Sequence, residues 1–260
     1  MRGLWAAWLI SAVVSMPWPH VAVGTEAVRK GRVVPSAATV AGQAHQPGDG
    51  VRQVVYRLDF SEFTGGSVED WLESKGFKLR DAAKNPGELG LSIVDGALKL
   101  EAKTQLRGFI YNDSLHIEPF SAVRLEWGVT KFPEGASYEK HLRNEALMVY
   151  FSFGDQKISS GSLIMPNLPY FIGLFLCKAD NLNVPYLGAY YHTGGRFVCV
   201  GHPQPSETVV SEFDLRSAFR TYFDITEAPY ISGINLGVDT SASGGGGTAG
   251  AFIKRIEVLK

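Results

Sequence analysis

The chain has 260 residues, of which 45% are hydrophobic and 20% charged, and its 25 basic and 26 acidic residues give a net charge of -1. This composition is that of a globular protein with a core of ordinary size, in one sizeable domain. No cluster of Lys and Arg stands out, so nucleic acid is disfavoured as a partner. The 29 glycines and 12% aromatic residues indicate many turns and aromatic strands, which is typical of a β-rich fold.

The N-terminus has the pattern of a secretory signal peptide. Arg2 is followed by the apolar run GLWAAWLISAVVSM, and small residues stand at Ala22 and Gly24. The run is too short to span a bilayer comfortably, although an uncleaved membrane anchor is the alternative. We expect a signal peptide over residues 1–24.

The segment after the signal peptide is small, polar and irregular. We expect a flexible linker over residues 25–51 and a single domain over residues 52–260. No later apolar run is long enough for a transmembrane helix, so we expect no membrane span after cleavage and a secreted or periplasmic location. The sequence does not bear on the oligomeric state.

Strand patterns dominate the domain in chain order. VVYRLDF has strand composition, and alternation of apolar and polar residues predicts half-exposed strands at 97–102 and 122–129. ALMVYFSF at 146–153 is apolar on both faces and predicts a central strand. In GINLGVD, residues 233–239, one face carries Ile, Leu and Val, while the other carries Gly, Asn, Gly and Asp and is nearly bare.

Helix signals are few. Ser67 and Asp70 have the spacing of a capping box before a short helix, and Ser211 and Asp214 have the same spacing before the apolar stripe of LRSAFRTYF. Strands with one or two short helices predict an all-β fold, an antiparallel β-sandwich of jelly-roll type, concanavalin-like or galactose-binding-like.

Two cysteines, Cys177 and Cys199, leave two states open. We expect strands at 170–177, 185–191 and 196–200, and in a meander the first and third would lie about 9–10 Å apart. That separation exceeds disulfide reach, so the pattern favours buried free thiols. A different strand order would allow the disulfide, which export would permit.

The glycine run Gly244–Gly247 has no Lys after it and leads into a strand, so it matches neither a phosphate loop nor a dinucleotide fingerprint. We expect it to be a flexible hairpin loop that joins the last two strands. In the last strand, Lys254 and Arg255 break the alternation, which indicates a β-bulge or an exposed edge.

Three segments carry a family resemblance: FRTYFDITEAPYISGINLGVDTSASGGGGTAGAFIKRIEVL, LRGFIYNDSLHIEPFSAVRLEWGVTKFPEG and RNEALMVYFSFG. Together they resemble the bacterial domain-of-unknown-function family 3047 over about residues 56–260. The chain departs from the family pattern in three places. Ser241 replaces the second Asp after Asp239-Thr240, Lys254 and Arg255 replace acidic residues, and Met148 replaces an Arg. The resemblance implies export and a β-sandwich, and it implies no reaction.

Catalytic patterns are weak. Glu69, Asp70 and Glu73 would fan around a helix turn and read as a solvated face. The histidines are scattered, and no Ser lies in a nucleophile elbow. Asp59 and Glu62 could help to hold a structural calcium ion, although a turn Asp and a surface Glu are the favoured interpretation. We therefore expect no catalytic residue, no metal and no cofactor, while the question of an enzyme stays open.

A binding site is easier to support. Tyrosine rings can stack on sugars while amide, carboxylate and guanidinium groups fix hydroxyls. The expected site residues are Tyr186, Tyr190, Arg143, Asn235 and Asp239. We expect a non-catalytic module for carbohydrate or another polar ligand. The alternatives are a polysaccharide hydrolase or lyase, which needs converging acidic or basic groups, and a surface domain that binds another protein through a flat apolar patch.

Overall fold

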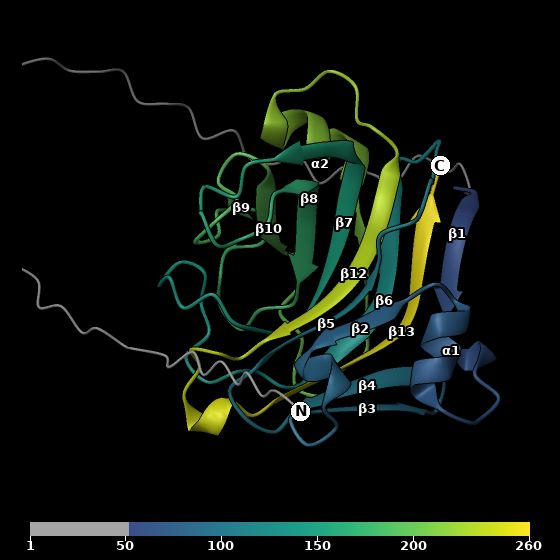
Figure 1. Cartoon of the computed structure of the whole chain (residues 1–260), viewed down its shortest axis with the longest axis vertical. Helices are drawn as coiled ribbons and strands as arrows, with labels where there is room; N and C mark the ends of the chain where they lie inside the picture. Colours follow the sequence, from purple (N-terminus) through teal and green to yellow (C-terminus); the bar gives the residue numbers. More distant parts are fainter. Residues whose placement is uncertain (1–51) are drawn as a thin grey trace, which may run out of the picture. The chain divides into compact units, whose positions relative to one another are not determined.

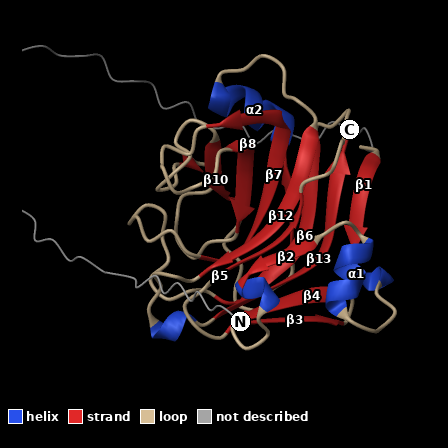
Figure 2. Ribbon diagram, in the orientation of Figure 1, coloured by secondary structure: helices blue, strands red, loops and turns tan. Residues whose placement is uncertain are grey.

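The computed structural model describes residues 52–260, which form two β-sheets packed face to face (Figure 1). The fold is the predicted β-sandwich, and the short helices lie at its edges (Figure 2). The expected signal peptide and linker fall outside the described residues, and the domain start at residue 52 stays a prediction. Within residues 52–260, no helix has the length and hydropathy that crossing a membrane requires.

The first sheet has six strands in the order β11-β6-β13-β4-β3, with β1 paired to β13. Its strands are β1 (Val54–Asp59), β3 (Leu89–Val94), β4 (Ala97–Ala102), β6 (Ala122–Lys131), β11 (Val209–Phe213) and β13 (Ala249–Leu259). All of its pairings are antiparallel.

The second sheet has seven strands in the order β2-β5-β12-β7-β8-β10-β9. They are β2 (Lys78–Asp81), β5 (Arg107–Asn112), β7 (Glu145–Ile158), β8 (Leu168–Phe175), β9 (Pro185–Tyr186), β10 (Gly195–Cys199) and β12 (Ile231–Asp239). Its pairings are antiparallel except for β8 and β10, which run parallel.

The core between the sheets follows the predicted alternation. Leu125 and Trp127 of β6 are fully buried, whereas Arg124 and Glu126 between them face outward. Strand β7 lies in the middle of its sheet, and its run ALMVYFSF is buried on both faces except at Tyr150 and Ser152, which are half-buried on the outer face. The predicted inward face of β12, with Ile, Leu and Val, is confirmed.

The helices begin where capping side chains satisfy free N–H groups. In α1 (Val68–Ser74), Ser67 Oγ accepts from the Asp70 N–H at 3.2 Å, as predicted. In α2 (Leu215–Phe223), Asp214 alone caps, accepting from the Ser217 N–H at 2.9 Å. The predicted capping role of Ser211 is wrong, because this residue lies in β11 and accepts from Trp127 Nε1.

The glycine loop is not the predicted hairpin. It leads from β12 in the second sheet to β13 in the first, so it crosses the edge of the sandwich. Gly247 has φ of +79°, and a Cβ there would lie 2.2 Å from the backbone N of Gln105. Glycine is therefore needed for backbone contact. The predicted bulge in β13 is confirmed, since the register with β6 shifts between Ile253 and Arg255.

The cysteines form a disulfide, which overturns the prediction of free thiols. The Cα atoms of Cys177 and Cys199 lie 5.8 Å apart. The meander assumption fails because β9 occupies the sheet edge, and β10 pairs directly with β8 in parallel. Phe175 at the end of β8 is in register with Cys199, which brings the two sulfurs together.

A candidate binding face on the second sheet

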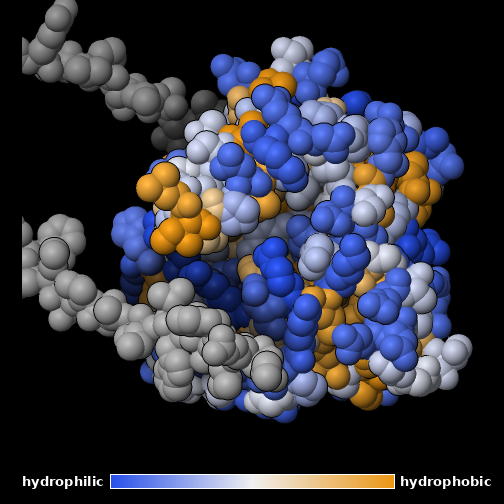
Figure 3. Space-filling view, in the orientation of Figure 1, coloured by the Kyte–Doolittle hydropathy of each residue, from blue (hydrophilic) through white to orange (hydrophobic). Residues whose placement is uncertain are grey.

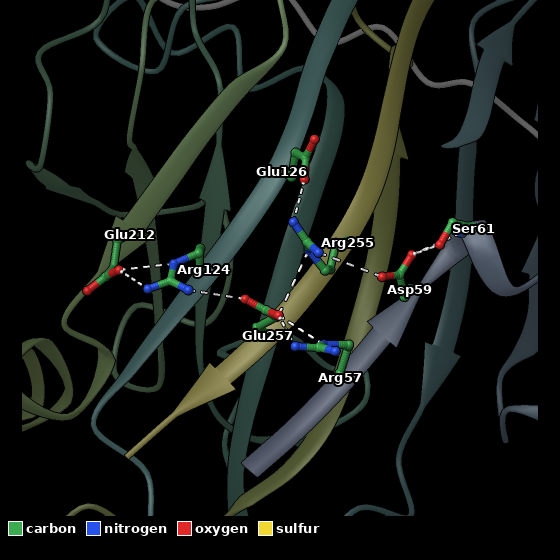
Figure 4. Close-up of polar contacts among 8 residues, drawn as sticks. All are labelled: Arg57, Asp59, Ser61, Arg124, Glu126, Glu212, Arg255 and Glu257. Atoms are coloured by element: carbon green, nitrogen blue, oxygen red, sulfur yellow. Dashed lines mark hydrogen bonds and ion pairs between the residues drawn. The ribbon is translucent and has the colours of Figure 1, made fainter. Parts of the chain in front are cut away.

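The outer face of the first sheet carries a network of ion pairs. Glu257, with a side chain 5% exposed, pairs with Arg57 at 2.9 Å and with Arg124 at 3.3 Å (Figure 4). Arg124 also reaches Glu212 at 2.9 Å, and Arg255 reaches Glu126 at 2.8 Å. These charges neutralise one another, so this face offers few free groups to a ligand.

The outer face of the second sheet carries aromatic and polar side chains in place of a network of ion pairs. One row of residues in register crosses the sheet with one member from each strand: Lys78, Tyr111, Asn235, Tyr150, Gly173, Phe197 and Tyr186. The row lies opposite the core side chains of β12, so it faces away from the first sheet. We call this surface the aromatic face.

Glycines let the aromatic rings lie flat on the sheet. A Cβ on Gly237 would lie 2.8 Å from Tyr150 Cε2 and 3.1 Å from Phe109 Cε1. A Cβ on Gly173 would lie 3.1 Å from Tyr150 Cδ1. The bare strand face predicted from GINLGVD is thus real, but rings from the neighbouring strands fill much of its room.

Asn235 is the polar centre of the row. Its Oδ1 is buried and has no hydrogen-bond partner among the described residues. A buried amide oxygen without a partner costs about 1–3 kcal/mol, so it is retained only where something compensates the loss. Asn235 lies between Tyr111 and Tyr150 in the row, so its amide is the polar group at the middle of the aromatic face.

Asp239 stands four residues further along β12 and is held by four donors. It accepts from Arg107 Nε at 2.6 Å, from Asn144 Nδ2 at 3.0 Å, and from the N–H and hydroxyl of Ser241 at 2.9 and 2.6 Å. Ser241, which stands where the family that the sequence resembles has a second Asp, is therefore one of its partners. The acidic group directly across the ladder is Glu145.

Glu145 is buried against two tyrosines. Its carboxyl accepts from the Tyr138 hydroxyl at 3.1 Å and from the Tyr150 hydroxyl at 3.5 Å. Burial raises the pKa of Glu145 well above its ordinary value, and the charge of Asp239 raises it further. Burial, together with Glu145, also raises the pKa of both tyrosines. The carboxyl groups converge, but protein donors occupy both, so the pair orients Tyr150 and Arg107 rather than presenting a free base.

The loop after β9 leans over the face. Tyr191 has φ of +61°, a strained conformation for a bulky residue. Its hydroxyl donates to the Pro166 carbonyl at 2.8 Å, and its ring meets Phe171 edge-on at 5.5 Å. Burial raises its pKa, while the charge of Arg80 from β2 opposes the rise.

The predicted site residues fall into two groups. Asn235 and Asp239 share the face of β12. Arg143 and Tyr186 support the β9 loop: Arg143 Nε donates to the Leu187 carbonyl at 3.0 Å, and Tyr186 donates to Glu139 at 2.8 Å. Tyr190, 44% exposed, lies in the loop and not on the predicted strand, so it does not alternate regularly with Tyr186.

Tyr138 connects the two groups. Its hydroxyl donates to Glu145, which lies opposite Asp239 in the ladder, and its ring centre lies 5.8 Å from that of Tyr186. The space-filling view shows a hollow left of centre, in the region of β8, β10 and β12, with apolar surface at its rim (Figure 3). The loops at this end of the sheet expose several large apolar side chains: Leu163, Ile164, Leu182, Val184 and Leu187.

The two carboxylates that could have shared a calcium ion lie in different local contacts. Asp59 accepts from Ser61 at the start of a 3-10 turn, and Glu62 pairs with Lys75 at 2.7 Å, so the two carboxylates serve different partners. Within residues 52–260, the grouped ligands that could hold a metal are Cys177, Cys199 and His202, and the disulfide consumes both thiols.

The sequence prediction missed Glu145, Tyr150, Arg80 and Arg107. Tyr150 was hidden in a run that is apolar on both faces, and the one signal was a hydroxyl-bearing ring among the outward positions of β7. Arg80 lies on a strand of only four residues, too short to show a clear alternation.

No family model matches the sequence, and no curated protein matches it either, so the resemblance to family 3047 stays a prediction. Among solved structures, the chain is similar to the carbohydrate recognition domain of Emp46p at 14% identity and TM-score 0.39, covering 77% of this chain and 94% of that one. It is similar to the xyloglucanase domain of NopAA from Sinorhizobium fredii at 11% identity and TM-score 0.38, covering 72% and 95%. A family 29 carbohydrate-binding module matches at 10% identity and TM-score 0.30, covering 70% and 78%. Similarity of this low degree identifies neither ligand nor activity.

Proposed function

We propose that this chain is an exported, non-catalytic protein whose β-sandwich binds a carbohydrate on the aromatic face. The observation that carries the proposal is the partnerless Asn235 Oδ1 between two tyrosines, in the middle of a row that crosses the whole sheet. Sugars combine apolar ring faces with hydroxyl groups, so a site for them combines flat aromatic rings with a few fixed polar groups.

The second support is how firmly the neighbouring groups are held. Tyr150 lies against glycines on both sides and donates to Glu145, and Asp239 holds Arg107 in place. A site whose groups are already oriented loses little entropy when a ligand binds. Glu145 and Asp239 supply this orientation while their oxygens are held by protein donors, which favours binding over hydrolysis.

The test is glycan-array binding with the full chain and with the variant Asn235→Leu. Leucine has a similar size and lacks the unsatisfied oxygen, so the variant should fold while losing selective binding. Lys99→Gln, an exposed position on β4 of the other sheet, is the matched control and should bind like the wild type.

Three results would speak against the proposal. Equal binding by wild type and Asn235→Leu would remove Asn235 from the site. Silence of the folded wild type across the array would shift support to a protein partner. Release of new reducing ends from a bound glycan would support the hydrolase alternative.

A further inference from the structure

We infer that the ligand is an anionic polysaccharide, whose carboxylate or sulfate groups are received by Lys78, Arg80 and Arg107 along the β2–β5 border of the aromatic face. This inference rests on the proposed function and narrows it to one class of glycan. The support comes from the N–H donors that a ligand would contact on that border and from the acidic partners that these donors already have.

Arg80 covers the aromatic rings of β5. Its guanidinium carbon lies 4.8 Å from the Phe109 ring centre and 5.6 Å from that of Tyr111, and its side chain is 53% exposed. A ligand that reaches this border therefore meets guanidinium N–H groups instead of an open aromatic ring. A planar guanidinium that stacks on a ring keeps its donors in the plane, where they match the two oxygens of a carboxylate or sulfate.

Two more cations flank Arg80 on the same face. Lys78 is exposed, stands two residues away, and has no side-chain hydrogen bond or ion pair within residues 52–260. Arg107 gives its Nε–H to Asp239, and its side chain is 54% exposed. Its terminal N–H groups have no partner in the part of the chain that the structure describes. Successive outward residues of a strand are about 7 Å apart, so the three cations form a short strip.

The acidic groups nearby occupy only part of the donors in this strip. Asp239 is already shared by Arg107, Asn144 and Ser241, and burial favours the neutral form of Glu145. Asp81 contacts only the Arg80 Nε, at 3.4 Å. Arg80 and Arg107 thus each meet a carboxylate through Nε alone, whereas Glu257 of the first sheet is shared by two arginines, Arg57 and Arg124. Among the described residues, the ammonium of Lys78 and the terminal N–H groups of Arg80 and Arg107 therefore remain free to bind an anion on the proposed binding face.

The test is affinity electrophoresis of the full chain in gels that contain one polysaccharide each. Polygalacturonate supplies carboxylates, dextran sulfate supplies sulfates, and xyloglucan is neutral. We expect retardation by one of the anionic polymers, weakened when salt rises from 20 to 200 mM because exposed charges are screened. Arg80→Gln and Lys78→Gln should each weaken the retardation about threefold to tenfold. Lys99→Gln removes an equal charge from the other sheet and should have no effect.

The outcomes separate this inference from the function it rests on. Binding of xyloglucan that ignores salt and Arg80→Gln would overturn the inference and leave carbohydrate binding intact. An equal loss in Lys99→Gln would show general charge attraction and overturn it as well. No retardation by any of the three polymers, with a melting curve that shows folded protein, would contradict both the inference and the use of these glycan classes. The polymer that retards the chain decides between carboxylate and sulfate.

Discussion

Replacing both half-cystines by alanine should lower the stability of the domain by a predictable amount. Cys177 and Cys199 are 22 residues apart in sequence, and cross-linking a loop of that length reduces the entropy of the unfolded chain. The chain-entropy relation then gives about 3 kcal/mol at 25 °C. For a domain of this size, 1 kcal/mol corresponds to roughly 2–4 °C, so the melting temperature should fall by about 6–12 °C.

The assay is thermal unfolding of wild type and of the Cys177→Ala, Cys199→Ala double variant, each with and without a phosphine reductant. The reductant should bring the wild type close to the variant and leave the variant unchanged. Tyr186, Tyr190 and Tyr191 all lie inside the loop that the bond closes, so reduction should also weaken glycan binding. A double variant within about 1 kcal/mol of wild type, together with a wild type whose melting temperature the reductant does not change, would refute the reasoning.

Three other substitutions test separate parts of the structure. Asn235→Leu should keep or raise the melting temperature, by about 2–4 °C, because it removes a buried amide oxygen without a partner; a fall of that size would show that the amide is satisfied within the protein. For Glu145→Gln, the raised pKa sets the sign: the stability that the carboxyl contributes is complete below its unfolded pKa and is lost as pH rises through the folded pKa. Melting curves from pH 4 to pH 8 should thus favour the variant increasingly over wild type, and a constant difference would contradict the assignment. Glu257→Ala removes the acid shared by Arg57 and Arg124 and should lower the free energy of unfolding in urea by about 2 kcal/mol, whereas a loss under 0.5 kcal/mol would show that the network contributes little.

The sandwich and its core were predictable because alternation is a local property of a strand. The two-residue period of a strand was enough to predict the core positions Leu125 and Trp127 on β6 and the apolar side of β12. Strand order is not local. The parallel neighbours β8 and β10, and the passage of the glycine loop between sheets, depend on which edges remain open after the rest has paired. The predictions of free thiols and of a hairpin failed for that reason.

The candidate site divides along the same line. Asn235 and Asp239 were predictable, since polar residues alternating with glycine on a strand leave an unusual outward face. Glu145 and Arg107 were not, because each acquires its role only from the strand that pairs with β12. Arg143 and Tyr186 have side chains that hold the loop after β9, so the hydroxyls of a ligand would need other partners.

The pairing of the first and last strands has a practical consequence. The N–H groups of Gln53 and Lys260 each donate to the other's carbonyl, at 3.2 and 2.9 Å, and the C-terminus lies beside β1 in Figure 1. A linker of a few residues could join these ends into a circular permutant, or the unit could be spliced into an exposed loop of a host protein. The junction would lie on the first sheet, so the aromatic face of the second would remain open to solvent.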